Sequence, residues 1–388
     1  MNEYQKVMTD ANNLYDAALA AIKINKWKAT SQKFEMNMLY YISKAQKELT
    51  DQTYKNGDVN EFVMSERGKT RAISSLSPYD KMIRHVFCDK ILVPKLEKYL
   101  IYDNGASIKG KGISFTRRRF KEHLQKYYRE YGTNEGYILF GDFSKYYDNI
   151  LHSKIREDIG KVFDYDPYVM WLLNEMLKGF EIDMSDREES VEELLLEKFN
   201  RLEYKNPHKG KKMIPKSVNI GDQLSQIIGV FYPHKIDNYI KIVQGNKYYG
   251  RYMDDFYVIS KDKEYLKQLI KDIIKIADEY GINMNLKKTR IIKISSVYKF
   301  LQIRYSLTDT GKVITKINPK CVTRMRRKIK KLVNKDIDYK TIENTYRGWF
   351  YSFYKYMSNK TKDNINDLYN ELYIEPFLKK KIMIGGKV

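Results

Sequence analysis

The chain has 388 residues, enough for two or three subdomains around a substantial core. Its 71 Lys and Arg residues against 49 Asp and Glu residues give a formal net charge of +22, which favours a polyanionic partner such as nucleic acid. Only Cys88 and Cys321 are present, far apart, so the sequence argues against a disulfide framework and a zinc site, and we expect a cytoplasmic protein. The N-terminus does not resemble a signal peptide, and no apolar run approaches the ~20 residues of a membrane span, so we expect no membrane association.

Helices are predicted for the start of the chain. Apolar residues within 1–50 recur at three- and four-residue spacing, which is the period of one helix face: Leu14, Ala18, Ala21 and Ile22, then Met38, Tyr41 and Ile42. Residues 51–135 follow, with a basic turn and a further helix predicted from about Pro78 to Tyr99.

Strands and helices alternate over residues 136–310, the pattern of an α+β sheet layered with helices. Tyr137 to Phe140 form a short apolar run that predicts a buried strand, and Asp142 lies at its end. The later segment YYGRYMDDFYVIS predicts strand, tight turn and strand, with Asp254 and Asp255 at the turn.

An insertion is predicted at about residues 182–213. Its first half is predicted to be an acidic helix with an apolar stripe of Val191, Leu194, Leu195, Phe199 and Leu202, and its second half is basic. A segment packed on the sheet domain is the preferred interpretation, and a docking surface for a partner or an RNA is the alternative.

Residues 319–388 are predicted to be helical. In CVTRMRRKIKKLVNK, the residues Val322, Met325, Ile329 and Leu332 share one face, and around it lie the cations Arg324, Arg326, Arg327, Lys328, Lys330 and Lys331. The pattern indicates a basic amphipathic helix.

The three carboxylates Asp142, Asp254 and Asp255 form the candidate catalytic set. Taken singly, a strand-end Asp could cap a helix and an acidic turn could be solvated surface. Taken together, one Asp at a strand end and two on a later hairpin form the ligand set that two-metal phosphoryl transfer requires.

At these positions the chain resembles bacterial reverse transcriptases. DFSKYYD (142–148) resembles their first catalytic motif, and YMDD (252–255) resembles their catalytic hairpin. Four further blocks occur in the family's order: FVMSERGKTRAI (62–73), IPKSVNIGDQLSQ (214–226), GINMNLKKT (281–289) and KFLQI (299–303).

The resemblance implies an α+β right-hand polymerase fold, with fingers, a palm of antiparallel sheet plus helices, and a helical thumb. The corresponding boundaries are N-terminal helices at 1–50, fingers at 51–135, palm at 136–310 with the insertion, and thumb at 311–388.

The resemblance also implies the catalytic roles. Asp142, Asp254 and the backbone carbonyl of Phe143 would hold two Mg²⁺ ions, for which Mn²⁺ could substitute, and Asp255 would complete the set. Lys288 would protonate the departing pyrophosphate.

Nucleotide contacts follow from the same comparison. Lys69 and Arg71 would hold the triphosphate of a deoxynucleotide, assisted by Phe143 and Gln223. Tyr147 lies five residues after Asp142, where the family carries a bulky aromatic ring that would clash with a ribose 2′-hydroxyl. DNA rather than RNA is therefore the expected product.

Template and primer contacts are assigned in the same way, to Gly221, Ser225, Gln226, Tyr252, Met253, Phe300, Leu301, Arg324, Arg327, Lys328 and Lys331.

Two positions depart from the family. Asn219-Ile220-Gly221 stands where many relatives have Pro-Gln-Gly, so Gln223 or Gln226 could substitute or fidelity could be relaxed. Gln302 stands where the primer grip usually ends in Gly.

The expected partners are an RNA template, an RNA–DNA duplex and deoxynucleotides, with a protein partner or a second copy left open. No maturase or endonuclease module follows the thumb, and the retron signatures NAxxH and VTG are absent from the sequence. The preferred role is DNA synthesis on a dedicated non-coding RNA in bacterial anti-phage defence. The alternatives are a diversity-generating or retron-like enzyme, a protein-primed or non-templated DNA polymerase and, least favoured, a non-catalytic RNA-binding scaffold.

Overall fold

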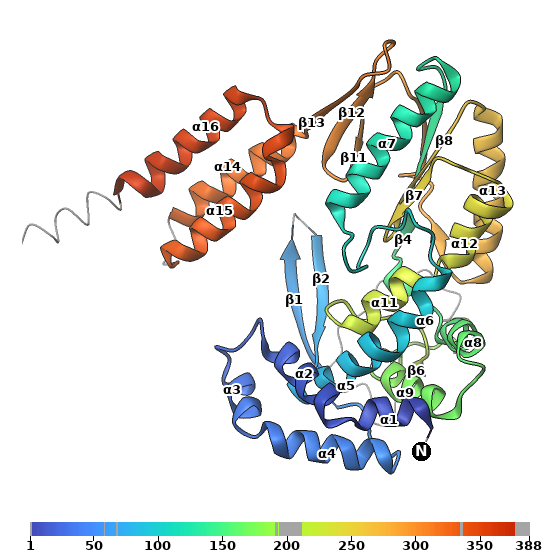
Figure 1. Cartoon of the computed structure of the whole chain (residues 1–388), viewed down its shortest axis with the longest axis vertical. Helices are drawn as coiled ribbons and strands as arrows, with labels where there is room; N and C mark the ends of the chain where they lie inside the picture. The colour runs from blue at the N-terminus through green and yellow to red at the C-terminus, as the bar shows by residue number, and fades with distance from the viewer. Residues whose placement is uncertain are drawn as a thin grey trace, which may run out of the picture. The chain divides into compact units, whose positions relative to one another are not determined.

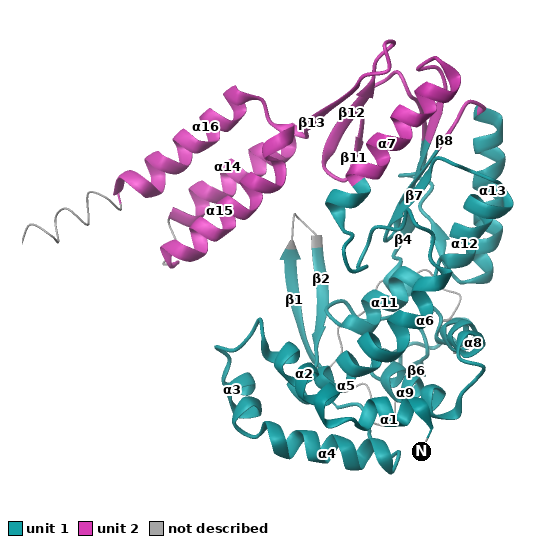
Figure 2. Cartoon of the chain, viewed as in Figure 1, with its two compact units in different colours: residues 1–116, 139–258, 263–290 teal, residues 117–138, 259–262, 291–388 magenta. Residues whose placement is uncertain are grey.

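The computed structural model describes residues 2–57, 59–66, 69–190, 193, 212–333 and 337–376. The chain forms two compact units, which Figure 2 distinguishes by colour. Unit 1 comprises residues 1–116, 139–258 and 263–290, and unit 2 comprises residues 117–138, 259–262 and 291–388. Each unit is therefore assembled from segments that are separated along the sequence.

Unit 1 begins with the four helices predicted from the apolar spacing: α1 (Glu3–Thr9), α2 (Ala11–Ile22), α3 (Ala29–Met36) and α4 (Met38–Thr50) (Figure 1). Side-chain caps explain where the first two helices begin. Asn2 accepts a hydrogen bond from the Gln5 amide, and Asp10 accepts one from the Asn13 amide. Leu14, Ile22 and Ile42 of the predicted apolar faces are buried.

A long hairpin follows these helices. Strands β1 (Asn60–Glu66) and β2 (Lys69–Ser75) pair antiparallel, and Met64 faces Arg71 across the ladder. Next comes one continuous helical stretch over the range predicted from the sequence, formed by α5 (Pro78–Val86), the π-helical turn η1 (Phe87–Leu92), α6 (Val93–Leu96) and the 3₁₀ turn η2 (Glu97–Tyr99). Ser77 caps α5 at its N-terminus, and Pro78 occupies the first turn, where a missing N–H has no cost.

The other helical elements of unit 1 are η3 (Tyr147–Asn149), α8 (His152–Val162), α9 (Pro167–Lys178), α11 (Gln223–Phe231), α12 (His234–Asn238), η4 (Tyr239–Val243) and α13 (Lys263–Glu279). Helix α11 is apolar around nearly its whole circumference, and Leu224, Ile228 and Phe231 are all buried in it. It is therefore a central helix rather than a surface one.

A four-stranded sheet carries the predicted catalytic segments. Its strand order is β10 (Arg290–Lys293), β3 (Tyr137–Gly141), β8 (Asp255–Ser260) and β7 (Tyr249–Tyr252). Two short antiparallel pairs add to unit 1: β4 (Phe143–Ser144) with β9 (Asn283–Met284), and β5 (Ile182–Asp183) with β6 (Met213–Ile214). The predicted buried strand at 137–140 and the predicted hairpin around 254–255 are both confirmed.

Unit 2 contains most of helix α7 (Ile113–Tyr131) and a three-stranded antiparallel sheet of β11 (Tyr298–Phe300), β12 (Ile303–Leu307) and β13 (Val313–Ile317). Its C-terminal part is helical, with α14 (Pro319–Val333), α15 (Tyr339–Phe353), η5 (Tyr354–Tyr356), α16 (Asn359–Tyr369) and η6 (Asn370–Ile374). These helices share one apolar cluster, in which Ile329, Tyr346 and Tyr369 are buried.

The predicted apolar stripe of the insertion, at 191–202, lies outside the described residues. Every helix within the described part of the chain is too short or too polar to cross a lipid bilayer.

Candidate active site

Asp142 follows directly on the last residue of strand β3 and is only 7 % exposed. Its Oδ2 accepts hydrogen bonds from Lys288 Nζ at 2.7 Å and from Asn285 Nδ2 at 3.1 Å. The Asn285 amide also donates to the Asp142 carbonyl at 2.8 Å, which holds the 285–288 turn against the strand end. The predicted first catalytic motif (142–148) and the GINMNLKKT block (281–289) therefore meet at this carboxylate.

The hairpin of β7 and β8 carries the other two carboxylates. Tyr252 pairs with Asp255 at its tip, and Met253 adopts a left-handed backbone conformation with φ of 54°. Asp254 lies half-buried at the turn, and Asp255 is exposed.

The hairpin tip lies beside Asp142 because β8 packs tightly against the end of β3. A Cβ atom added at Gly141 would lie 2.1 Å from Phe256 Cζ, so this position has no room for any side chain. The rings of Phe143 and Phe256 also pack with centroids 5.7 Å apart. Glycine thus lets the residues that flank both carboxylate segments come into contact.

Lys288 is the cation on which all three carboxylates act. Partial burial of its ammonium lowers the pKa, but Asp142, and after it Asp254 and Asp255, outweigh this effect, so the pKa of Lys288 is raised. The charges of all three carboxylates therefore act on this ammonium, which is directly bonded to Asp142. Within the described residues, no three His, Cys, Asp or Glu side chains are grouped closely enough to bind a metal without rearrangement. The donor set is nevertheless carboxylate oxygen, which suits a hard divalent cation.

A buried ion pair lies directly behind the hairpin. Arg251 and Asp237 are both fully buried, with Arg251 Nη2 2.7 Å from Asp237 Oδ2 and Nε 2.8 Å from Oδ1. Arg251 Nη1 also donates to the Met253 carbonyl at 3.0 Å, and Nη2 donates to the Val230 carbonyl at 2.7 Å. Tyr249 donates a further hydrogen bond to Asp237. One side chain thus connects the turn of the β7–β8 hairpin, the end of α11 and α12.

Tyr147 lies against this same hairpin. Its Oη is 3.8 Å from Met253 Sδ. Burial, and after it the charge of Asp254, raises the pKa of Tyr147 to about 12. The ring predicted to exclude ribonucleotides is therefore packed beside the carboxylates.

The predicted triphosphate-binding residues belong to the β1–β2 hairpin. Arg71 is exposed. The backbone of Lys69 pairs with that of Glu66 at the end of the hairpin. The Ser74 amide of β2 donates to the Ile220 carbonyl at 3.2 Å, which attaches this hairpin to the predicted template motif. Gly221 has a φ of 111°, and an added Cβ would lie 3.2 Å from the Ser74 carbonyl oxygen, so both backbone conformation and space favour glycine.

A second buried ion pair supports the template motif. Arg84 of α5 is 1 % exposed and forms an ion pair with Asp222, which caps α11. Of the polar residues of this motif, Gln226 is exposed and Ser225 is fully buried. Gln223 donates its amide to Asp89. Gln226 is therefore the better placed of the two glutamines proposed to substitute for the missing Gln.

The predicted primer grip, which lies in unit 2, keeps a glycine-like turn without glycine. Leu301 and Gln302 have φ of 44° and 71°, and the buried Phe300 packs its ring on Phe120, with centroids 5.0 Å apart. Arg117 donates two hydrogen bonds to the Leu301 carbonyl, at 2.9 and 2.7 Å. The Gln302 side chain accepts one from Arg324 at 3.1 Å. These contacts offset the cost of the left-handed conformation at a position where the family usually has Gly.

Helix α14 has the predicted amphipathic form. Met325 and Ile329 are buried, and Val322 and Leu332 pack partly buried against the same cluster. All six predicted cations of this helix are exposed: Arg324, Arg326, Arg327, Lys328, Lys330 and Lys331.

Reversing three of these charges, at Arg327, Lys328 and Lys331, is expected to weaken binding to an RNA–DNA duplex and to reduce the slope of log affinity against log salt by about 3, at about 1 per lost phosphate contact. Titrations at several salt concentrations measure both quantities. A matched variant reverses the exposed Lys6, Lys23 and Lys33 of the N-terminal helices. Equal effects of the two variants would show that α14 has no specific role in duplex binding.

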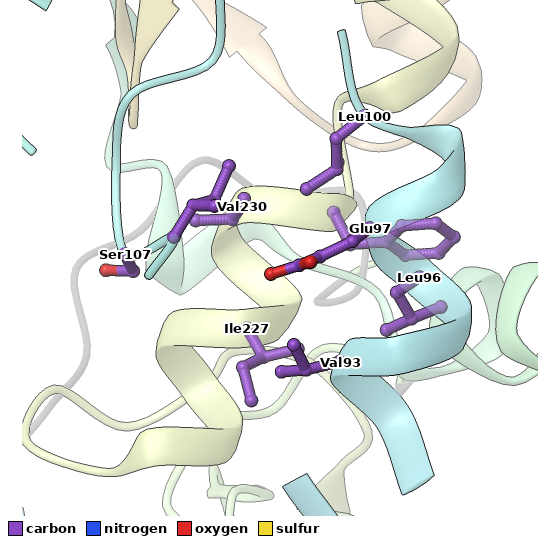
Figure 3. Close-up of a pocket in the computed structure, with 9 residues that line it drawn as sticks. Val93, Leu96, Glu97, Leu100, Ser107, Ile227 and Val230 are labelled. Atoms are coloured by element: carbon purple, nitrogen blue, oxygen red, sulfur yellow. The ribbon is translucent and has the colours of Figure 1, made fainter. Parts of the chain in front are cut away.

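One pocket lies between helix α11 and residues 93–100 (Figure 3). Ile227 and Val230 of α11 face Val93, Leu96 and Leu100 across it, and the Glu97 carboxylate lies among these apolar groups. None of the predicted site residues lines this pocket. This face of α11 is therefore separate from the face that carries Ser225.

Sequence reasoning missed the Arg251–Asp237 and Arg84–Asp222 ion pairs. A local signal existed for Arg251, because a cation inside the apolar strand segment YYGRYM requires a buried partner. The identity of the partner had no signal in the sequence, since Asp237 lies in helix α12 and Arg251 lies in strand β7.

Two observations together indicate a nucleotidyl-transferring polymerase: an ammonium that is bonded to Asp142 and also acted on by the charges of Asp254 and Asp255, and a sheet that carries the three carboxylates at the end of β3 and on the antiparallel β7–β8 hairpin. A family model described as Reverse transcriptase (RNA-dependent DNA polymerase) matches residues 55–305. Because this match covers well over half of the 388 residues, the chain belongs to the reverse transcriptase family. The α+β fold predicted from the sequence is the fold of this family.

Solved structures with related folds include telomerases from two yeasts. The telomerase of Candida albicans, solved in complex with a TWJ fragment of telomeric RNA, has 14 % identity and a TM-score of 0.47 over 87 % of this chain and 62 % of its own. Apo telomerase of Candida tropicalis has 15 % identity and a TM-score of 0.47 over 85 % and 59 %. The chain thus spans about three fifths of these telomerase chains. No curated protein matches it.

Proposed function

We propose that this protein is an RNA-directed DNA polymerase that adds deoxynucleotides to a primer hydroxyl. The observation that carries the proposal is that Lys288, bonded to Asp142, is also acted on by the charges of Asp254 and Asp255 within a chain of the reverse transcriptase family. Phosphoryl transfer requires little covalent participation by protein, so positioning and charge neutralisation by these groups account for most of the catalysis.

Two divalent cations, Mg²⁺ by preference, complete the proposed site. Asp142, Asp254 and the Phe143 carbonyl would hold them, with Asp255 orienting the set. When bound, they would activate the primer hydroxyl and neutralise the charge of the leaving pyrophosphate. The Lys288 ammonium, already bonded to Asp142, is the proposed proton donor to pyrophosphate. Lys69 and Arg71 are the proposed triphosphate ligands, with Arg favoured for bidentate contact.

The direct test of activity is primer extension. The purified protein is offered an RNA template with an annealed DNA primer, deoxynucleotides and Mg²⁺, and the product is analysed for template-complementary DNA. Product of unrelated sequence would indicate non-templated synthesis, and product attached to protein would indicate protein priming. Absence of any product from all nucleic-acid substrates would contradict the proposal.

Tyr147→Ala is expected to admit ribonucleotides and to reduce the preference for deoxynucleotides by at least about tenfold, since a pocket contact of this size discriminates on that scale. The physical reason is removal of the ring that would meet a 2′-hydroxyl. Separate kcat/KM values for a deoxynucleotide and its ribonucleotide measure the preference. Tyr15→Ala, at a tyrosine that is 46 % exposed on α2, serves as the control. If the Tyr147 variant still discriminates against ribonucleotides as the unmodified protein does, Tyr147 is not the gate that excludes them.

For the biological role, we propose synthesis on a dedicated non-coding RNA in bacterial anti-phage defence, in the cytoplasm. The support is the absence, in the sequence, of the retron signatures NAxxH and VTG. The test is purification from the native host and sequencing of both the bound RNA and the attached DNA. A bound repeat-associated RNA with mutagenised product would favour a diversity-generating enzyme instead.

A further inference from the structure

Gly229 is a helix-interior glycine that the backbone does not require. It lies within α11 (Gln223–Phe231) and is not among the glycines with a positive φ. Glycine in a helix interior costs about 1 kcal/mol relative to alanine. A reason in packing must therefore be sought.

The reason is the ring of Tyr147. A Cβ atom added at Gly229 would lie 2.8 Å from Tyr147 Oη, 3.0 Å from Cζ and 3.4 Å from Cε1. The phenol end of Tyr147 thus lies directly on the backbone of α11, in space that any side chain at residue 229 would occupy.

The remaining surroundings hold the ring in this position. Met253 Sδ lies 3.8 Å from Tyr147 Oη, on the side of the catalytic hairpin. Tyr146 packs edge-on against Tyr147, with centroids 5.5 Å apart, and donates its own hydroxyl to the Gly229 carbonyl at 2.7 Å. The ring is therefore enclosed by α11, by the neighbouring tyrosine and by the hairpin turn.

Helix α11 cannot readily move away to accommodate a side chain. Its N-terminal cap, Asp222, is paired with the buried Arg84, and the Val230 carbonyl near its C-terminus accepts a hydrogen bond from Arg251 at 2.7 Å. Its opposite face, with Ile227 and Val230, lines the pocket toward α6 (Figure 3), so these two anchored ends are what hold the helix in place. At about 100° per residue, Gly229 points away from that face. A new methyl group would therefore displace the ring and not the helix.

We propose that Gly229 is a specificity-determining residue, which sets how far the Tyr147 ring projects toward the sugar of the incoming nucleotide. This inference rests on the proposed role of Tyr147 as the gate. With no side chain at residue 229, the ring sits back against α11 and leaves room for a deoxyribose. A side chain there advances the ring and narrows the sugar site.

Gly229→Ala is expected to raise KM for deoxynucleotides about tenfold, since overpacking a filled site costs enough for this factor. The kcat is expected to change less, and ribonucleotides are expected to remain excluded. The effect is expected to depend on the ring: smaller in a Tyr147→Phe background, which lacks the nearest atom, and absent in a Tyr147→Ala background. Steady-state kinetics of the six combinations of residues 147 and 229 form the experiment.

Gly348→Ala is the matched control, because Gly348 also lies in a helix, α15, and an added Cβ would meet nothing within 4 Å. If Tyr147→Ala admits ribonucleotides but Gly229→Ala leaves KM unchanged, the inference fails and the gate stands. If Tyr147→Ala has no effect on discrimination, the gate and the inference both fail. If Gly229→Ala acts equally in all three Tyr147 backgrounds, the glycine has a structural role only, and the inference is also overturned.

Discussion

Replacing Asp254 and Asp255 together with alanine is expected to lower nucleotide addition by at least about a thousandfold, because a metal site that neutralises transition-state charge supplies several kcal/mol. These two carboxylates raise the pKa of Lys288 together with Asp142, so the double variant leaves the ammonium with Asp142 alone. RNA binding is expected to remain within about twofold, since phosphate contacts provide most of the affinity for nucleic acid.

Single-turnover primer extension and filter binding measure the two quantities. The matched control is Asp16→Ala with Asp51→Ala, which removes the same charge from two exposed positions of the N-terminal helices. Full incorporation by the Asp254–Asp255 variant would remove the basis of the proposed site. Loss of both synthesis and RNA binding would indicate a folding defect. In that case Asp142→Asn, which removes the charge and keeps the shape of the side chain, would test the proposed site independently.

Replacing Arg251 with Gln is expected to reduce the free energy of unfolding by about 3–5 kcal/mol, the cost of removing one partner from a buried ion pair. Asp237 would be left fully buried without its cation. Burial lowers the pKa of Arg251, but Asp237 outweighs this effect, so the pKa is raised and the Arg251 guanidinium is charged at all physiological pH values. The Met253 carbonyl would also lose its hydrogen bond, so synthesis is expected to fall more steeply than stability alone explains.

Chemical denaturation measures the first effect, and primer extension well below the unfolding midpoint measures the second. The control is Lys161→Gln, which removes one of the two lysine partners of Glu157 from a surface pair with side chains 55 % and 35 % exposed. Its effect is expected to stay below about 1 kcal/mol. The double variant Arg251→Gln with Asp237→Asn is expected to be less destabilised than the sum of its parts, because the two residues share one interaction. If the losses of unfolding free energy in the two single variants simply add, the Arg251–Asp237 pair does not hold the hairpin in place.

Local patterns predicted the local elements well. The spacing of Leu14, Ala18 and Ile22 predicted α2, and the charge and apolar pattern of 321–335 predicted α14, because helix periodicity is read within a few turns. The flanking β-branched and aromatic residues of the YMDD turn predicted β7 and β8 for the same reason. The roles of the site residues and the boundaries of fingers, palm and thumb remain predictions.

The residues that these elements contact in the fold had no comparable signal in the sequence. Tyr147 and Gly229 are 82 positions apart, and nothing in their local sequence indicates that a phenol ring occupies the place of a side chain on α11. Likewise, the primer-grip turn departs from the family at Gln302, yet it keeps the glycine-like backbone through Arg117 and Arg324, which come from two different helices.

By itself, the sequence determined the family, the order of its motifs and the three acidic side chains, since the type and local spacing of residues carry that information. Only the tertiary structure decided what surrounds them: the ammonium of Lys288 bonded to Asp142, the buried Arg251 behind the hairpin, and the bare backbone of Gly229 against the ring of Tyr147. The physical reason is that burial, ion pairing and steric exclusion depend on distances across the fold, which separation along the chain does not specify.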